Sequence, residues 1–409
     1  MVRSVLVSLS IAAVFSATCW AAKPHHKHVA AAARAASAAP SASTPAVSAP
    51  VVAGMAIPGP PQVDARADIL ADYQTGKVLA ASNATDRMEP ASLTKLMTAY
   101  IVFHELSVGK LKLQDMVTVS EHAWRSEGSR TFIELGKPVS VNDLILGMIV
   151  QSGNDATIAL AERIAGTEET FAQLMNSTAK SLNMVGSHFE NSSGLPSPQH
   201  YTTARDMSLL AIAMIRDYPQ YYKYYSVREF EHNGIKQQNR NGLLEKDPSV
   251  DGLKTGHTDS AGFCLVTSAR REGMRLVSVV LGSTSMKGRE NASAALLSYG
   301  FTFYDTKLVV KGGMALATTH VWKAANPSAD LGIKSDLFMT LARGQLDLKT
   351  SVDVTPKLIA PLGADANVGT LHVFNGKEVL ASVALHPLKP VAAGGWWRRL
   401  IDTIRLWFA

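Results

Sequence analysis

Three serine–lysine pairs in the sequence have two residues between the partners, a spacing that puts both side chains on one face of a helix. A serine hydroxyl is a weak nucleophile, and a neutral lysine can activate it by taking its proton. Such pairs also arise by chance, so their context must separate them. The pairs are Ser92/Lys95, Ser107/Lys110 and Ser177/Lys180.

Context favours the first pair. Ser92 follows Pro90 and opens an apolar run with helical spacing. A serine at a helix start also has its oxygen close to free backbone N–H groups. Ser107 lies just before a glycine and Ser177 lies in a polar stretch, so both are interpreted as surface positions. The nucleophile is therefore predicted to be Ser92, with Lys95 as its base.

Two later motifs supply what this base requires. Ser152 and Asn154 follow an apolar helical segment, and Lys254 opens a run that leads into a strand. Lysine is a base only when its pKa falls by several units, and both desolvation and a nearby cation lower that pKa. Lys254 is the candidate cation. Ser152 can relay a proton to the leaving amine, while Asn154 holds Lys95 or the substrate amide.

The residues after Lys254 suit a peptide substrate. Thr255 offers a hydroxyl to a carboxylate, and Gly256 lets a substrate lie against the strand edge as an added strand. Cys264, in a strand-like run, is expected to be a buried and inert thiol.

The elements that must position these groups can be located by their patterns. A hairpin is predicted around residues 69–80, helices over 140–217, a second hairpin over 263–281 and a last helix over 292–299. Ser140 with Asp143 resembles a capping box. A strand pair, a helical block and further strands predict an α+β fold, in which helices pack on an antiparallel sheet.

The motifs together resemble those of the low-molecular-mass penicillin-binding proteins, specifically the serine-type D-Ala-D-Ala carboxypeptidases. The resemblance covers residues 64–305. It implies a serine β-lactamase/transpeptidase-like fold, with a helical block on a five-stranded antiparallel sheet. The matching stretches are Pro90–Lys95, Gln151–Asp155, Asn191–Pro196, Asn239–Asn241 and Asp251–His257.

The resemblance also implies roles. Ser92 would be acylated, Lys95 would be the general base, and Ser152 and Asn154 would relay protons and position groups. The backbone N–H groups of Ser92 and His257 would form the oxyanion hole.

The same resemblance implies the substrate. Lys254, Thr255 and Arg289 would receive the terminal carboxylate of a peptidoglycan pentapeptide stem, from which the last D-Ala is removed. Arg289 rests on the local pattern of residues 282–289, and a solvated loop arginine is the alternative. β-Lactam antibiotics would acylate Ser92. No cofactor or metal is implied, since the sequence has neither a His-Glu-x-x-His motif nor a paired-cysteine site.

The N-terminal part predicts export. A basic residue, a short apolar core and small residues near Ala21 indicate a signal peptide over residues 1–21, with an uncleaved anchor as the alternative. Residues 22–62 are rich in Ala, Pro and Ser and predict a disordered linker. The catalytic domain is then expected over residues 63–305.

The C-terminal part predicts two further units. Short Val- and Leu-rich strands with glycine turns indicate an all-β domain over residues 306–390. Residues 394–409 form an amphipathic pattern with three arginines on one face, too short to cross a bilayer. We expect the helix Trp396–Phe408 to lie in the cytoplasmic membrane surface, on the periplasmic side. Docking on its own protein is the alternative.

The same features disfavour some other functions and leave others open. The net charge of +6 comes without a basic stripe interleaved with aromatics, which argues against nucleic acid. A β-lactamase would need a deacylating glutamate, and Glu229 with Asn233 has that spacing but lies in a strand-like run. A DD-endopeptidase would share every motif. A non-catalytic, membrane-anchored cell-wall scaffold remains the alternative from another class.

Overall fold

The computed structural model describes residues 57–344 and 348–408. The predicted signal peptide and the predicted linker up to residue 56 lie outside the described residues. A five-stranded antiparallel sheet organises the first part of the chain, in the order β2-β1-β9-β8-β7. This confirms the expected fold class. Its strands are β1 (Ala67–Asp72), β2 (Val78–Ser82), β7 (Val250–Thr258), β8 (Gly262–Arg271) and β9 (Met274–Ser283).

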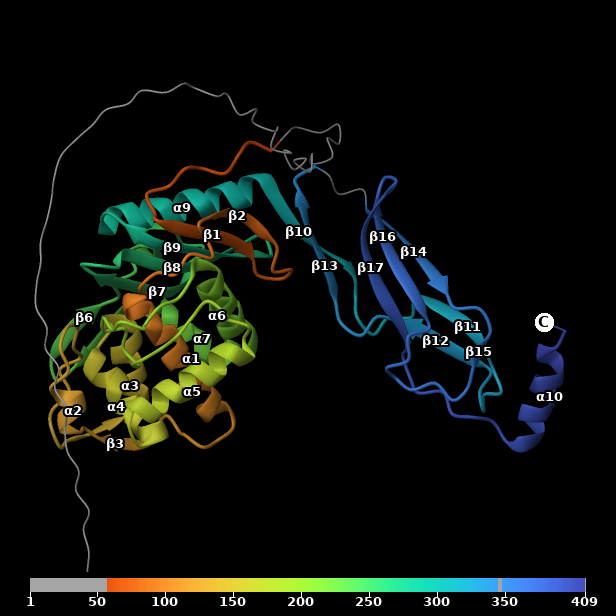
Figure 1. Ribbon diagram of the computed structural model, residues 1–409, viewed down its shortest axis with the longest axis horizontal. Helices are drawn as coiled ribbons and strands as arrows, with labels where there is room; N and C mark the ends of the chain where they lie inside the picture. Colours follow the sequence, from red (N-terminus) through yellow and green to blue (C-terminus); the bar gives the residue numbers. More distant parts are fainter. Residues whose placement is uncertain (1–56, 345–347, 409) are drawn as a thin grey trace, which may run out of the picture. The chain divides into compact units, whose positions relative to one another are not determined.

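The sheet is buried on both faces. Successive strand residues point to opposite faces, so Ile69 and Val279 join one apolar cluster while Leu70 and Val280 join another. Helix α9 (Met286–Phe303) lies along one face, and the helical block covers the other (Figure 1). The block comprises α1 (Lys95–Ser107), α2 (Glu121–Trp124), α3 (Val141–Leu146), α4 (Asn154–Ala165), α5 (Glu168–Ser181), α6 (Ala204–Asp217) and α7 (Pro219–Tyr222), with the short turns η1 (Ala91–Thr94), η2 (Gly147–Gln151) and η3 (Lys223–Ser226).

Serine hydroxyls cap the first turns of helices α3 and α9. The Ser140 hydroxyl accepts a hydrogen bond from the Asp143 N–H at the start of α3, as the capping pattern predicted. Helix α9 begins at Met286, six residues before the predicted start at Ala292. Its first turn is polar and lacks apolar periodicity, whereas Ser285 caps it by accepting from the Gly288 N–H.

Two small strand pairs lie against the helical block, and one short helix leads into the main sheet. Strand β3 (Met116–Thr118) pairs with β4 (Pro138–Ser140), and β5 (Glu229–His232) pairs with β6 (Ile235–Gln238). Helix α8 (Leu243–Lys246) precedes β7.

The chain after α9 is built from strands around a third apolar cluster. Strands β10 and β13 pair with each other, and six others form a sheet in the order β14-β16-β17-β12-β11-β15. Helix α10 (Trp396–Leu406) follows. The strands are β10 (Tyr304–Val310), β11 (Ala317–Trp322), β12 (Ser328–Gly332), β13 (Leu337–Ala342), β14 (Leu348–Val354), β15 (Leu358–Ile359), β16 (Gly369–Asn375) and β17 (Glu378–Pro387).

Candidate active site

Ser92 lies on a 3₁₀ turn, η1, directly before helix α1 begins at Lys95. The sequence predicted a continuous helix here, and the tighter turn still leaves both side chains on one side. The turn packs against strand β7 at Gly256, where an added Cβ would lie 3.2 Å from the Ser92 nitrogen and 3.0 Å from the Pro90 oxygen. A side chain at this position would press on the turn that carries Ser92, so glycine suits this close approach.

Lys95 is buried, with 1% of its surface exposed, yet its amine is fully engaged. Its Nζ lies 2.9 Å from Ser92 Oγ, 2.7 Å from Asn154 Oδ1 and 2.6 Å from the Ser193 carbonyl oxygen. Burial lowers the pKa of Lys95 to about 7, and the Arg240 guanidinium contributes to that decrease. A substantial fraction of this amine is therefore neutral near pH 7 and able to take the proton of Ser92.

A second buried lysine lies across the site. Lys254 is 2% exposed and donates to Ser152 Oγ at 2.9 Å. Burial, followed by the positive charge of Lys95, lowers the pKa of Lys254 well below its usual range. The sequence predicted Lys254 as the cation that lowers the pKa of Lys95, and this is wrong in detail: the charge that lowers it is that of Arg240, to which the sequence assigned no role, whereas Lys95 lowers the pKa of Lys254.

Ser152 has an unusual backbone. It ends the π-helical turn η2 with φ +67°, a left-handed conformation that costs a non-glycine residue about 1–3 kcal/mol. Because Ser152 Oγ accepts from Lys254, its own O–H is free to donate elsewhere. Ser152 lines the cavity next to Ser92, where it can deliver a proton.

Strand β7 is an edge of the main sheet and carries Thr255, Gly256 and His257. An edge strand leaves backbone groups free to pair with an extended peptide. Arg289 is 3% exposed and donates from Nη1 to the Gly256 carbonyl at 3.1 Å. It lies in the first turn of α9, so the solvated-loop alternative is wrong for this arginine.

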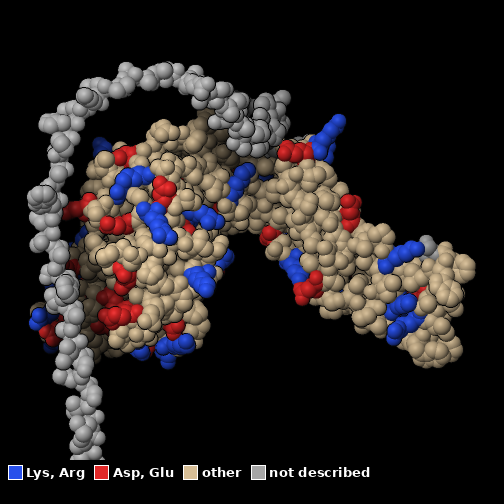
Figure 2. All heavy atoms as spheres, in the orientation of Figure 1, with Lys and Arg blue, Asp and Glu red and all other residues tan. Residues whose placement is uncertain are grey.

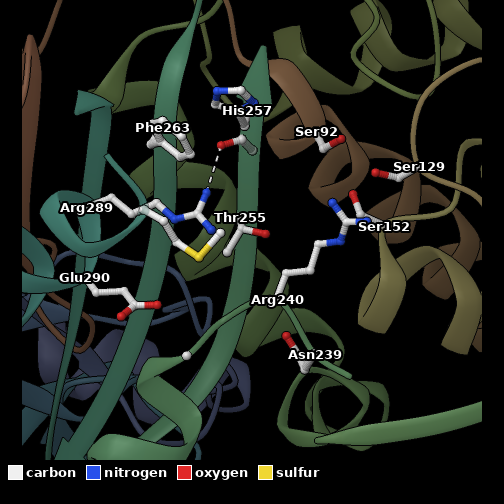
Figure 3. A pocket seen from close by; sticks show the side chains of 13 residues that line it. Ser92, Ser129, Ser152, Asn239, Arg240, Thr255, His257, Phe263, Arg289 and Glu290 are labelled. Carbon is white, nitrogen blue, oxygen red and sulfur yellow. Dashed lines mark hydrogen bonds between the residues drawn. The ribbon is translucent and has the colours of Figure 1, made fainter. Parts of the chain in front are cut away.

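Most of these groups line one cavity of about 480 Å³ (Figure 3). They include Ser92, Ser152, Thr255, His257 and Arg289. Its wall also contains residues to which the sequence assigned no role. They are Ser129, Asn239, Arg240, Gly242, Phe263, Met286 and Glu290.

The loop that carries Ser129 is fastened from helix α4. The Asp155 carboxylate accepts from the backbone N–H groups of Thr131 and Phe132, each at 2.8 Å. The Asn154 N–H donates to the Ser129 carbonyl at 2.7 Å. Asp155 is adjacent to the predicted Asn154, but spacing alone could not reveal that it binds a loop more than twenty residues away.

The other candidates lie elsewhere. The Ser107 and Ser177 hydroxyls donate to backbone carbonyls on exposed helix surfaces, as expected. Glu229 is exposed on β5, and neither it nor Asn233 lines the cavity. Cys264 is buried, and burial raises the pKa of its thiol, consistent with an inert residue.

Residues 55–285 match the sequence profile of the D-alanyl-D-alanine carboxypeptidase family, and residues 304–393 match that of the penicillin-binding protein 5 C-terminal domain. The chain belongs to the D-alanyl-D-alanine carboxypeptidase family. Like other members, it is a serine-class hydrolase with D-alanyl-D-alanine carboxypeptidase activity.

Curated relatives and solved structures agree with this assignment. The carboxypeptidases DacA and DacC of Escherichia coli K12 are 42% and 44% identical to this chain, over 86% and 85% of it and 90% and 89% of their own lengths. Penicillin binding protein 5 from Haemophilus influenzae superposes with a TM-score of 0.78 at 40% identity, covering 81% of this chain and 99% of that one.

Proposed function

We propose that this carboxypeptidase acts through an acyl-enzyme on Ser92, with Lys95 as the general base. The observation that carries the proposal is the environment of the Lys95 amine. Two carbonyl oxygens, from Asn154 and Ser193, accept its two N–H bonds when it is neutral. Its lone pair then faces Ser92 Oγ, 2.9 Å away.

Acylation proceeds by a balanced exchange. As Ser92 Oγ attacks the carbonyl carbon of the penultimate D-Ala, its proton passes to Lys95 Nζ. Backbone N–H groups of Ser92 and His257 stabilise the oxyanion. The C–N bond breaks as Ser152 gives its proton to the departing amine, and Lys254 donates a hydrogen bond to the Ser152 oxygen. Ser152 then takes back the proton that Lys95 removed from Ser92, so that one proton moves in total from Ser92 to the amine. D-Ala leaves as the free amino acid. Water then hydrolyses the ester on Ser92.

The cationic wall of the cavity favours a substrate that ends in a carboxylate. Lys254, Thr255 and Arg289 are proposed to receive the terminal carboxylate of a peptidoglycan pentapeptide stem, and Arg240 adds positive charge to the same cavity. β-Lactams are proposed to acylate Ser92. Penicillin-binding protein D2 from Listeria monocytogenes, 31% identical over 58% of this chain, has been solved in its ampicillin-bound form.

Release of D-Ala from a soluble pentapeptide tests this activity. The full chain should liberate one D-Ala per peptide, and Ser92→Ala should liberate none. A strict endopeptidase or a non-catalytic scaffold would release no D-Ala from this uncross-linked substrate, which would overturn the proposal. Asn154→Asp is a useful companion variant, because it keeps an oxygen near Lys95 while it adds a charge.

We further propose that the chain is an exported, periplasmic enzyme divided into a catalytic domain (63–305), an all-β domain (306–390) and a membrane-binding helix (394–409). None of the described helices is long and apolar enough to cross a bilayer. On the face shown in Figure 2, basic and acidic residues are interspersed. Among the described helices, α10 is the candidate for attachment to a membrane.

The exposure pattern of α10 supports this attachment. All of its apolar residues except the half-buried Leu406 are exposed, from 46% for Ile401 to 64% for Trp396, and Phe408, which follows the helix, is 87% exposed. Asp402, on the polar face, is 5% exposed and accepts a hydrogen bond from the Lys323 N–H at 2.7 Å. The helix thus contacts its own protein through the polar face and leaves the apolar face for the interface of a bilayer. A chain truncated before Trp396 should no longer sediment with membranes, and continued sedimentation would contradict attachment through α10.

A further inference from the structure

The direction of the Lys95 lone pair depends on two oxygen atoms. A neutral amine has two N–H bonds and one lone pair, so two fixed acceptors determine where the lone pair points. Asn154 Oδ1 is fixed because the same amide donates from Nδ2 to the Glu127 carbonyl at 2.6 Å. The second acceptor is the Ser193 carbonyl, on a loop between helices α5 and α6. Whatever holds this loop also orients the base.

Three hydrogen bonds fasten the residue directly before that carbonyl. Glu168 Oε1 accepts from the Ser192 N–H at 2.9 Å and from the Ser192 hydroxyl at 2.6 Å. The Ser192 carbonyl accepts from Thr98 Oγ1 on helix α1 at 2.6 Å. Ser192 and Ser193 are at most 1% exposed, so water does not compete for these bonds.

We propose that Glu168 is a positioning residue for catalysis, which acts through Ser192 to hold the Ser193 carbonyl on the Lys95 amine. This inference rests on the proposed role of Lys95 as the base. Glu168 opens helix α5 and does not line the cavity around Ser92, so it acts on the reaction only through this loop and through its charge.

The charge of Glu168 gives the proposal a separate signature. Glu168 and Asp155 raise the pKa of Lys95, opposing burial and Arg240. Lys254 is the other buried lysine of the site, with its pKa lowered by burial, and His200, whose pKa burial lowers to about 4, is neutral near pH 7. On the side of Glu168 away from Ser192, His122 Nε2 lies 3.6 Å from Glu168 Oε2. Removal of the Glu168 charge should therefore move the acid limb of the acylation profile to lower pH.

The test measures the second-order rate constant for acylation of the full chain by a fluorescent penicillin, from about pH 5 to about pH 9, on both sides of the lowered pKa of Lys95 of about 7. Glu168→Ala should acylate about 10- to 100-fold more slowly, because the base loses its orientation. Glu168→Gln keeps an acceptor for Ser192, so it should stay within about threefold of the unmodified chain at high pH, with its acid limb shifted to lower pH. Glu169→Ala is the matched control, since Glu169 is the next acidic residue of the same helical turn.

An unchanged rate and profile in Glu168→Ala would overturn the proposal, as would an equal loss in Glu169→Ala. If Glu168→Ala does not fold, Ser192→Ala replaces it, since that variant removes only the hydroxyl bond to Glu168. It should acylate about three- to tenfold more slowly, and an unchanged rate would overturn the proposal. Covalent labelling of Ser92→Ala would instead show that the proposed function itself is wrong.

Discussion

The catalytic centre and helix α10 depart from the usual distribution of side chains in opposite ways. In the centre, Lys95 and Lys254 are buried, at 1% and 2% exposure, whereas in the helix Trp396 and Trp397 are exposed at 64% and 62%. Buried charges are costly unless they are hydrogen-bonded, and exposed apolar surface is costly unless it is covered. The centre satisfies its lysines internally. The apolar face of the helix is left uncovered by the described residues.

The largest effect is expected from Lys95→Met. This substitution keeps an unbranched side chain in the buried site but removes the base, so acylation by penicillin should fall about 10²- to 10⁴-fold. Loss of the buried amine leaves the Asn154 and Ser193 oxygens without a donor, so the unfolding temperature should fall by a few degrees. Stopped-flow labelling and thermal unfolding measure the two effects. Acylation at the normal rate would show that another group removes the proton from Ser92.

The pH dependence of acylation tests whether neutral Lys95 is the base. With a pKa of about 7, Lys95 is protonated and inactive below that pH and becomes a base above it. The acylation rate constant should therefore rise about tenfold per pH unit below about pH 7 and level off above it. A rate that is flat across this range, or that falls as the pH rises, would contradict a neutral Lys95 as base.

A substitution in α10 is expected to have an intermediate effect, on binding to phospholipid vesicles. Ile404→Glu places a charge on the apolar face, where the native side chain is 49% exposed, and should weaken binding to vesicles of anionic phospholipid about 10- to 100-fold. Thr403→Glu makes the same charge change one residue away, at the border of the apolar face and one turn after Arg399, and should weaken binding about fivefold or less. Vesicle sedimentation measures both. Equal losses would show that charge, and not apolar contact, governs attachment.

The smallest effect is expected from Glu229→Ala. Glu229 is exposed and lies outside the cavity wall, so hydrolysis of the penicilloyl-enzyme should change less than about twofold. The decay of labelled protein after removal of free penicillin gives this rate. A tenfold slower decay would favour the β-lactamase alternative, in which this glutamate activates water.

Side-chain chemistry made much of the site predictable, because Ser92, Lys95, Ser152 and Lys254 must be these residue types. Ser193 could not be found in this way, since it contributes only a backbone carbonyl, and any residue has one. Arg240 lay in a stretch that resembled the family, yet only the fold shows that its charge reaches Lys95. Both contributions depend on which residues the fold brings close together. The spacing of residues along the sequence does not show this.

The fold, too, was predictable from the sequence only in part. Apolar runs on both sides of a short polar turn correctly predicted both hairpins of the main sheet, and Ser140 correctly predicted a helix start. Two local details were not predicted. The polar first turn of α9 has no apolar periodicity, although it carries Arg289. The left-handed backbone of Ser152 is a state that serine rarely adopts, imposed here by the surrounding structure.

The central claim is that Ser92 forms the covalent intermediate. Intact-mass measurement after incubation with penicillin tests it most directly, using the full chain, Ser92→Ala and Ser107→Ala as the matched serine of another Ser-x-x-Lys pair. The full chain and Ser107→Ala should each gain the mass of one penicilloyl group, and Ser92→Ala should gain none. A penicilloyl adduct on Ser92→Ala would place the nucleophile elsewhere and contradict the account.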